Sequence, residues 1–409
     1  MFVVAVLHRH NTNMARKTNH RPGKLLLTAF LTSCFAVHAA EKSNPPAAKG
    51  KAEPPVLERI QWRDDEMRSL TVAGRVLVEA EDGGLLVLGQ DGRLSAVEKP
   101  QLVSRETTKE PFRALSAATL GKQLQTELGA GFDIVATRHY VICSSANRPY
   151  AQWCGTLFER LYVSFHNYWK QRGLKLSEPE FPLVALIFRG QKEFAAFATK
   201  DAGADAATAK GYYSIGTNRM VLYDLTASDA GPAGNETDIE QRLAAVPYNI
   251  ATSIHEATHQ IAFNSGMHTR FADNPLWLVE GMAMYFETPD LSSKSGWKTA
   301  GAVNDERLGQ FRDFVGRGRK SDSLVTLVTT DARFNDAEQM PDAYGEAWVL
   351  TQFLIRTKKE AYVKYLNMLA EKPRMVLDTP AERLAEFRAA FGDLPQLEAD
   401  MLKQAKRLK

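Results

Sequence analysis

Cysteine is scarce in this sequence, which contains three cysteines in 409 residues. Cys34 lies near the N-terminus, and only Cys143 and Cys154 lie further along the chain. This spacing resembles no cysteine-based metal site. In an oxidising compartment Cys143 and Cys154 could form a disulfide, and the alternative is a pair of partly buried free thiols.

The sequence also lacks a long basic run with interleaved aromatic residues, and its net charge of +3 is small for its length. Nucleic acid is therefore not an indicated partner. No internal repeat of 20–50 residues is present. With 44% hydrophobic and 24% charged residues, the composition is that of a globular protein with one to three domains.

A run of about 20 apolar residues, which a transmembrane helix needs, is missing near the N-terminus. Residues 25–37 form a shorter apolar run that follows a basic stretch beginning at Met14, a candidate start of translation. Small residues follow, so we expect residues 1–40 to be a signal peptide cleaved near Ala39 or Ala40, and the protein to be periplasmic or extracellular. Two alternatives are a retained anchor and a lipoprotein attached to the membrane through Cys34, which ends a lipobox-like Leu-Thr-Ser-Cys sequence.

The rest of the chain divides by composition into four stretches. Residues 41–58 are rich in Pro, Ala and Lys and predict a disordered linker. In residues 59–105, Asp-Gly pairs separate short apolar runs, which predicts a small antiparallel β module. Residues 106–300 have mixed α and β patterns, and residues 301–409 have mainly helical spacing. We therefore expect an α+β fold.

The most informative stretch is residues 248–289, which contains the sequence His255-Glu256-x-x-His259. Histidines at i and i+4 lie on one face of a helix, about 6 Å apart along its axis, so both can reach one zinc ion. Glu256 follows the first histidine and could take a proton from a water molecule on the metal. The surrounding residues predict a helix that is apolar nearly all round. A metal would satisfy the polar groups that such a helix buries.

The third ligand decides the class of such a site. A glycine at 262 and a histidine at 265 would indicate a metzincin, but the sequence has Ala262 and Ser265. His268 comes too late for that pattern, and we interpret it as a loop residue. The other known solution is a glutamate from a following helix.

A second helix after the motif supplies such a glutamate. Asn274 is a natural N-cap and Pro275 a natural first helical residue, which makes Glu280 the candidate third ligand. Gly281 would permit close helix packing, although a glycine within a helix costs about 1 kcal/mol. Glu287 lies on the same face as Glu280. It could hydrogen-bond a ligand histidine, or it could be a solvated carboxylate at the helix end.

The segments HEATHQ and PLWLVEGMAMYFE resemble the gluzincin zinc metallopeptidases, which combine HExxH with a tryptophan-leucine-x-glutamate-glycine helix about twenty residues later. The resemblance implies a zincin-like catalytic domain with His255, His259 and Glu280 as zinc ligands and Glu256 as general base. It extends from about residue 130 to the C-terminus and is greatest to exported bacterial members without a defined substrate.

The resemblance also implies roles outside the motif. Gly211–Leu225 would be the edge strand along which an extended peptide or protein substrate binds through its main chain. Tyr344 matches the position of a tyrosine that donates to the oxyanion, although it could equally be a core residue on an amphipathic helix. Tyr212, Tyr213 and Tyr285 are weaker candidates for the same role.

The expected activity is therefore zinc-dependent hydrolysis of peptide bonds. Two other functions stay open from the sequence. One is a non-catalytic, zinc-stabilised cell-envelope protein that serves binding or assembly. The other is hydrolysis of a non-peptide amide. An intact Glu256 argues against the first, because a purely structural site needs no general base.

Overall fold

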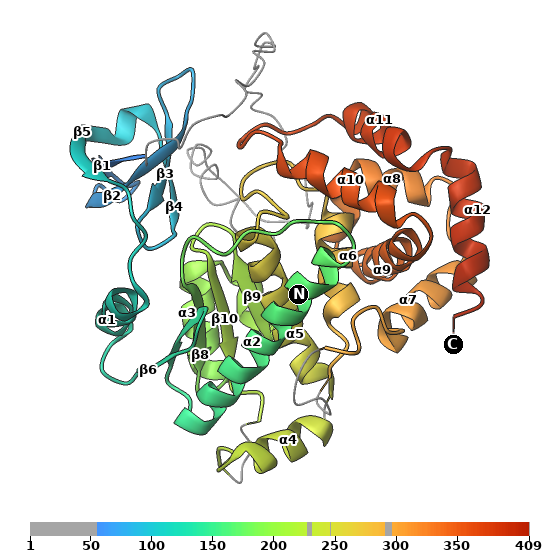
Figure 1. Ribbon diagram of the computed structural model, residues 1–409, viewed down its shortest axis with the longest axis horizontal. Coiled ribbons are helices and arrows are strands. Elements are labelled where there is room, and N and C mark those ends of the chain that lie inside the picture. The colour runs from blue at the N-terminus through green and yellow to red at the C-terminus, as the bar shows by residue number, and fades with distance from the viewer. Residues whose placement is uncertain (1–54, 227–230, 246, 291–296, 409) are drawn as a thin grey trace, which may run out of the picture.

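The computed structural model describes residues 55–226, 231–245, 247–290 and 297–408. The expected signal peptide, Cys34 and nearly all of the expected linker lie outside these residues. The described chain is an α+β structure with two five-stranded sheets and a large group of C-terminal helices (Figure 1).

The N-terminal sheet confirms the predicted antiparallel module, with wider bounds than expected. Its strands are β1 (Val56–Arg63), β2 (Ser69–Glu79), β3 (Leu85–Gly89), β4 (Leu94–Val97) and β5 (Leu102–Pro111). They lie in the order β4-β3-β2-β1-β5, and every pair is antiparallel. Residues 56–58 belong to β1 and not to a linker, and β5 continues past residue 105. Gly83 and Gly92 have φ values of 84° and 85°, as the glycine of an Asp-Gly turn requires.

The second sheet is mixed and carries the candidate site. Its strands are β6 (Asp133–Ala136), β7 (Tyr140–Ser144), β8 (Leu183–Phe188), β9 (Gly211–Ser214) and β10 (Arg219–Tyr223), in the order β6-β7-β8-β10-β9. The three central strands are parallel, and β6 and β9 pair antiparallel at the two edges. The segment Gly211–Leu225, which the resemblance implied to be the edge strand, contains a hairpin of β9 and β10, and only β9 lies at the edge of the sheet.

Helices cover both faces of this mixed sheet. One face packs on α1 (Ala117–Leu128) and α3 (Gln191–Asp201), and the other packs on α2 (Arg148–Lys170) and α5 (Pro247–Asn264). Cys143 belongs to the first layer and Cys154 to the second. Both are buried free thiols, so the disulfide interpretation is wrong.

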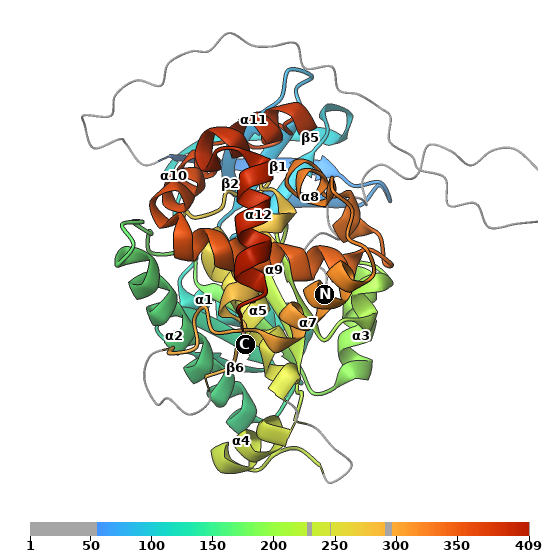
Figure 2. The same cartoon turned by 90° about the vertical axis from the view of Figure 1, so that its right-hand side faces the viewer.

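The C-terminal part is helical, as predicted. In residues 301–408 the helices are α7 (Asp305–Gly316), α8 (Ser323–Thr329), α9 (Met340–Thr357), α10 (Lys359–Ala370), α11 (Pro380–Phe391) and α12 (Leu394–Ala405). Two helices precede them: α6 (Leu276–Phe286) packs against α9, and α4 (Glu236–Ala245) lies apart near α2. The central helix is α9, which is buried from Ala343 to Ile355 and crosses behind α12 in Figure 2. Among the described helices, none combines the length and the apolar character that crossing a membrane would require.

Candidate metal centre

Two buried helices bring the three predicted ligands together. His255 and His259 lie on α5, Glu280 lies on α6, and each is at most 1% exposed. The Nε2 atoms of the two histidines are 2.9 Å apart. Glu280 Oε2 lies 3.1 Å from His255 Nε2, and Glu280 Oε1 lies 3.7 Å from His259 Nε2. Within the described residues, this group has the geometry to hold a metal ion.

The start of α6 differs from the prediction in a way that affects Glu280. Asn274 is not the N-cap, because its side-chain amide donates to the carbonyls of Thr269 and Ala272 within the preceding loop. Pro275 occupies the cap position, and the main-chain N–H of Leu276 donates to Asp331 Oδ1 at 3.0 Å. A carboxylate 55 residues further along therefore caps the helix that carries the third ligand.

Gly281 allows α6 to approach α9 closely, as the sequence suggested. A Cβ atom added at Gly281 would lie 2.1 Å from Thr351 Oγ1 and 3.0 Å from the carbonyl oxygen of Ala347. Side chains larger than hydrogen would therefore push the two helices apart. Because Glu280 is the neighbouring residue, this packing also determines how close the candidate third ligand lies to α9.

Glu287 is buried at 3% exposure, so the interpretation as a solvated carboxylate is wrong. Its Oε2 lies 2.7 Å from His255 Nδ1. Its Oε1 accepts from Asn304 Nδ2 at 2.7 Å and from Arg307 Nε at 3.1 Å. A proton held on Nδ1 leaves Nε2 of His255 available as a metal ligand and fixes the orientation of the ring.

The two oxygens of Glu256 have different surroundings. Oε2 accepts a hydrogen bond of 2.8 Å from the main-chain N–H of Tyr213 on the edge strand β9. Oε1 is buried and has no hydrogen-bond partner among the described residues. Burial raises the pKa of this carboxyl to about 8, against an ordinary value of 4.5. One oxygen is thus held in place and the other is free to take a proton.

The electrostatics of the cluster suit a cation. Burial alone would lower the pKa of His255, but the carboxylates of Glu280 and Glu287 outweigh it and raise the pKa to about 9. For Glu280 the penalty of burial is outweighed by the two histidines, which hold its pKa well below the usual range. Glu280 Oε1 is also buried without a hydrogen-bond partner. Two imidazoles and one carboxylate are a donor set that zinc accepts, so these residues fit the implied metal.

Tyr344 lies beside the candidate ligands and not in a remote part of the core. It is 6% exposed on α9, with its ring edge against Phe334 and the Arg307 guanidinium 5.4 Å from the ring centre. Burial raises the pKa of its hydroxyl well above 10, and the charges of Glu280 and Glu256 add to the effect.

The remaining candidates lie outside the donor group. His268 is in the loop between α5 and α6, as predicted, and it is buried against Phe263. The three weaker tyrosine candidates use their hydroxyls elsewhere: Tyr212 donates to Asp201, Tyr213 donates to Asn218, and Tyr285 pairs with Tyr168. The part of Tyr213 that reaches the site is its main-chain N–H, which a search for reactive side chains does not consider.

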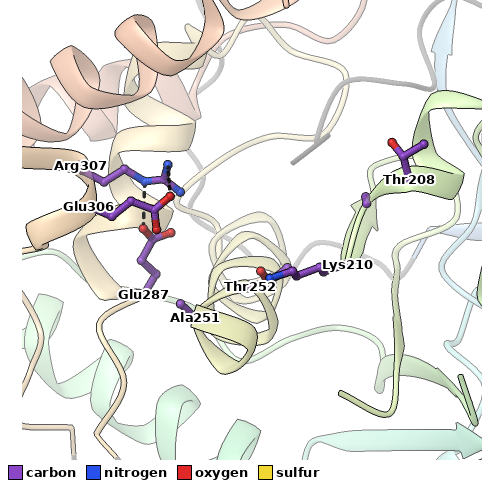
Figure 3. Close-up of a pocket in the computed structure, with 8 residues that line it drawn as sticks. Thr208, Lys210, Ala251, Thr252, Glu287, Glu306 and Arg307 are labelled. Carbon is purple, nitrogen blue, oxygen red and sulfur yellow. Dashed lines mark hydrogen bonds and ion pairs between the residues drawn. The ribbon is translucent and has the colours of Figure 1, made fainter. Parts of the chain in front are cut away.

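A cavity of about 480 Å³ adjoins the centre (Figure 3). It opens between the chain that enters β9, the turn of α5 that precedes His255, and the start of α7. The lining residues are Thr208, Ala209, Lys210, Ala251, Thr252, Glu287, Glu306 and Arg307. Glu287 and Arg307 therefore belong both to the wall of the cavity and to the support of His255.

Part of the chain is similar to a known protein family. Residues 249–375 are similar to a family described as a protein of unknown function, DUF1570. The matched segment begins within α5 and ends just after α10, so it contains every residue of the candidate centre except the main chain of β9. Among curated proteins, none matches the chain.

Proposed function

We propose that this protein is a zinc-dependent metallopeptidase of the gluzincin type with a zincin-like catalytic domain. One observation carries the proposal. His255, His259 and Glu280 meet in a buried cluster, and beside them Glu256 is held by one oxygen with the other unpartnered. A structural metal site would not need this additional carboxylate.

The reaction we propose is hydrolysis of a peptide bond. Zinc bound by the three ligands would supply Lewis acidity, which polarises a carbonyl and acidifies a water molecule. Glu256 Oε1 would take the proton of the attacking water and deliver it to the amine that leaves. The hydrogen bond from the Tyr213 N–H to Oε2 keeps the carboxylate oriented for both transfers.

Tyr344 is the proposed donor to the oxygen on which negative charge develops. Its hydroxyl is beside Glu280, in a buried environment where a hydrogen bond to an oxyanion is strong. Loss of one such donor typically lowers the rate by about 10²–10³. We further propose that the adjoining cavity receives a substrate side chain while β9 binds the substrate main chain.

Hydrolysis of casein and of a peptide library by purified wild-type protein and Glu256→Gln tests the proposal. The amide oxygen of glutamine can still accept from the Tyr213 N–H. The substitution therefore removes the general base and keeps the hydrogen bond that orients the side chain. We expect chelator-sensitive hydrolysis by the wild type and a loss of about 10²–10⁴ in rate for Glu256→Gln, with zinc retained. Glu360→Gln, at an exposed position on α10 that lines neither the centre nor this cavity, is the matched control and should keep wild-type activity.

Three results would contradict the proposal. Wild-type protein that binds zinc and hydrolyses nothing would favour the non-catalytic envelope function. Activity on non-peptide amides alone would favour the third function. Undiminished hydrolysis by Glu256→Gln would remove Glu256 from the mechanism.

A further inference from the structure

The turn that joins β9 to β10, residues 215–218, is hydrogen-bonded to α5, the helix that carries the candidate metal motif. Asn218 has a φ of 61°, a left-handed conformation that asparagine tolerates, and its N–H donates to Ser214 O at 2.8 Å. Its side-chain oxygen accepts from Tyr213 Oη and from Asn264 Nδ2, both at 2.7 Å. The turn is therefore tied to Asn264 at the end of α5.

The N-terminal β module holds the same turn from the other side. The N–H of Leu94, the first residue of β4, donates to Gly216 O at 2.8 Å. Arg270 Nη1 donates to Gly92 O at 2.9 Å and to Ile215 O at 3.2 Å. Arg270 is 7% exposed, and within the described chain no carboxylate lies within 4 Å of its guanidinium. A buried guanidinium thus bridges a carbonyl of the module and a carbonyl of the turn.

A second connection joins the module to the base of β10. Glu127 on α1 accepts two hydrogen bonds of 2.8 Å from Arg219, the first residue of β10. Arg93, which immediately precedes β4, pairs with the same carboxylate. The carboxylate of Glu127 therefore links β10, the strand after the turn, to the β module.

These contacts end at Ile215, two residues from the strand residue whose N–H holds Glu256. Tyr213, whose N–H holds Glu256 Oε2, is separated from Ile215 only by Ser214. A shift of the turn would therefore move the amide that orients Glu256. We propose that the β module is a positioning element of the active site, and that Arg270 is the positioning residue through which it fixes the β9–β10 turn. The kinetic part of this inference rests on the proposed function, and the structural part does not.

Hydrogen exchange of the full-length protein tests the inference with two independent variants. In Arg270→Gln the side chain is too short to donate to both Gly92 O and Ile215 O. Leu94→Pro removes the N–H that donates to Gly216, at the first position of a strand, where proline is tolerated. In both variants we expect main-chain exchange in residues 211–218 to be about tenfold faster, with exchange in β8 unchanged. Arg270→Lys, which keeps a buried donor, should restore most of the protection.

The matched control is Arg105→Gln, which removes ion pairs to Glu58 and Glu79 inside the module. It should leave exchange in residues 211–218 unchanged. If the protein hydrolyses peptides, the two turn variants should also lose about tenfold in kcat with unchanged zinc content, because a small misplacement of the base is costly.

Unchanged exchange of residues 211–218 in both variants would overturn the inference, whatever the activity. Equal acceleration throughout the mixed sheet would show a general packing role and would also overturn it. A wild-type protein without peptidase activity would contradict the proposed function, and the exchange result would still decide the role of the module.

Discussion

The helical side of the candidate centre and its strand side are held by different kinds of group. On the helical side, α5 and α6 supply the candidate ligands, and a buried chain of charges runs from His255 through Glu287 to Arg307 on α7. On the strand side, the contact with Glu256 is one main-chain N–H of β9. The helical side is thus specified by residue type, while the strand side is specified by where the backbone lies.

This difference predicts different responses to substitution. Changes on the helical side should alter zinc affinity and folding stability together, because the same buried residues serve both. Changes on the strand side should leave zinc in place and act on the orientation of Glu256. Substitutions on the helical side should therefore range from a large loss of both stability and zinc affinity to a small loss of stability alone.

Glu287→Ala should have the largest effect on the helical side. It removes the buried counter-ion of Arg307, whose side chain is 8% exposed, so the free energy of unfolding should fall by about 3–5 kcal/mol. Zinc affinity should fall by about 10–100-fold, because His255 loses the partner of Nδ1. Chemical denaturation and zinc titration measure the two effects. The double variant Glu287→Ala with Arg307→Met should recover part of the stability and none of the affinity; recovery of both would contradict a specific role of Glu287 toward His255.

Gly281→Ala should destabilise the protein by about 1–3 kcal/mol, because the added methyl group meets Thr351 and Ala347 of α9. Zinc affinity should fall as well, since Glu280 moves with α6. Thermal unfolding with and without zinc measures both. The control is Gly309→Ala in α7, where an added Cβ meets nothing within 4 Å and helix propensity should raise stability by up to about 1 kcal/mol. Equal effects at the two glycines would refute the close-packing argument.

Asp331→Ala should have a smaller effect, about 1 kcal/mol, through loss of the cap on α6. Asp331 also pairs with the buried Arg383 on α11, but that guanidinium donates two further hydrogen bonds to Asp273 and so keeps a carboxylate partner. Asp322→Ala is the matched control, because Asp322 stands at the N-cap of α8 without a side-chain capping hydrogen bond. Urea unfolding of the two variants should separate them, and indistinguishable midpoints would argue against the cap.

The sequence predicted the helical side well because its information is local. Spacing within one helix placed His255 and His259 on a common face, and the residues around Glu280 indicated a second helix. The antiparallel module followed from Asp-Gly turns in the same way. The residues around the two cysteines do not show whether a disulfide forms, because that depends on how the layers pack. Cys143 and Cys154 lie in the layers on opposite sides of the mixed sheet.

Long-range partners were not predictable from the sequence. Asn274 has the residue type of an N-cap, but the loop uses its amide, and Asp331 caps α6 from a distance. The burial of Glu287 depends on Asn304 and Arg307, which no local pattern connects to it. The role of Tyr213 is carried by a main-chain N–H, which every residue other than proline possesses. These features depend on which elements pack together.

The most direct test of the central claim is the zinc content of the purified wild-type protein beside Glu280→Ala, measured by elemental analysis without chelators. Far-ultraviolet circular dichroism on the same samples checks that both are folded. If His255, His259 and Glu280 form the metal centre, the wild type carries stoichiometric zinc and the folded variant loses it. Zinc-free wild-type protein that does not take up added zinc, or a variant that retains zinc with wild-type affinity, would contradict the account.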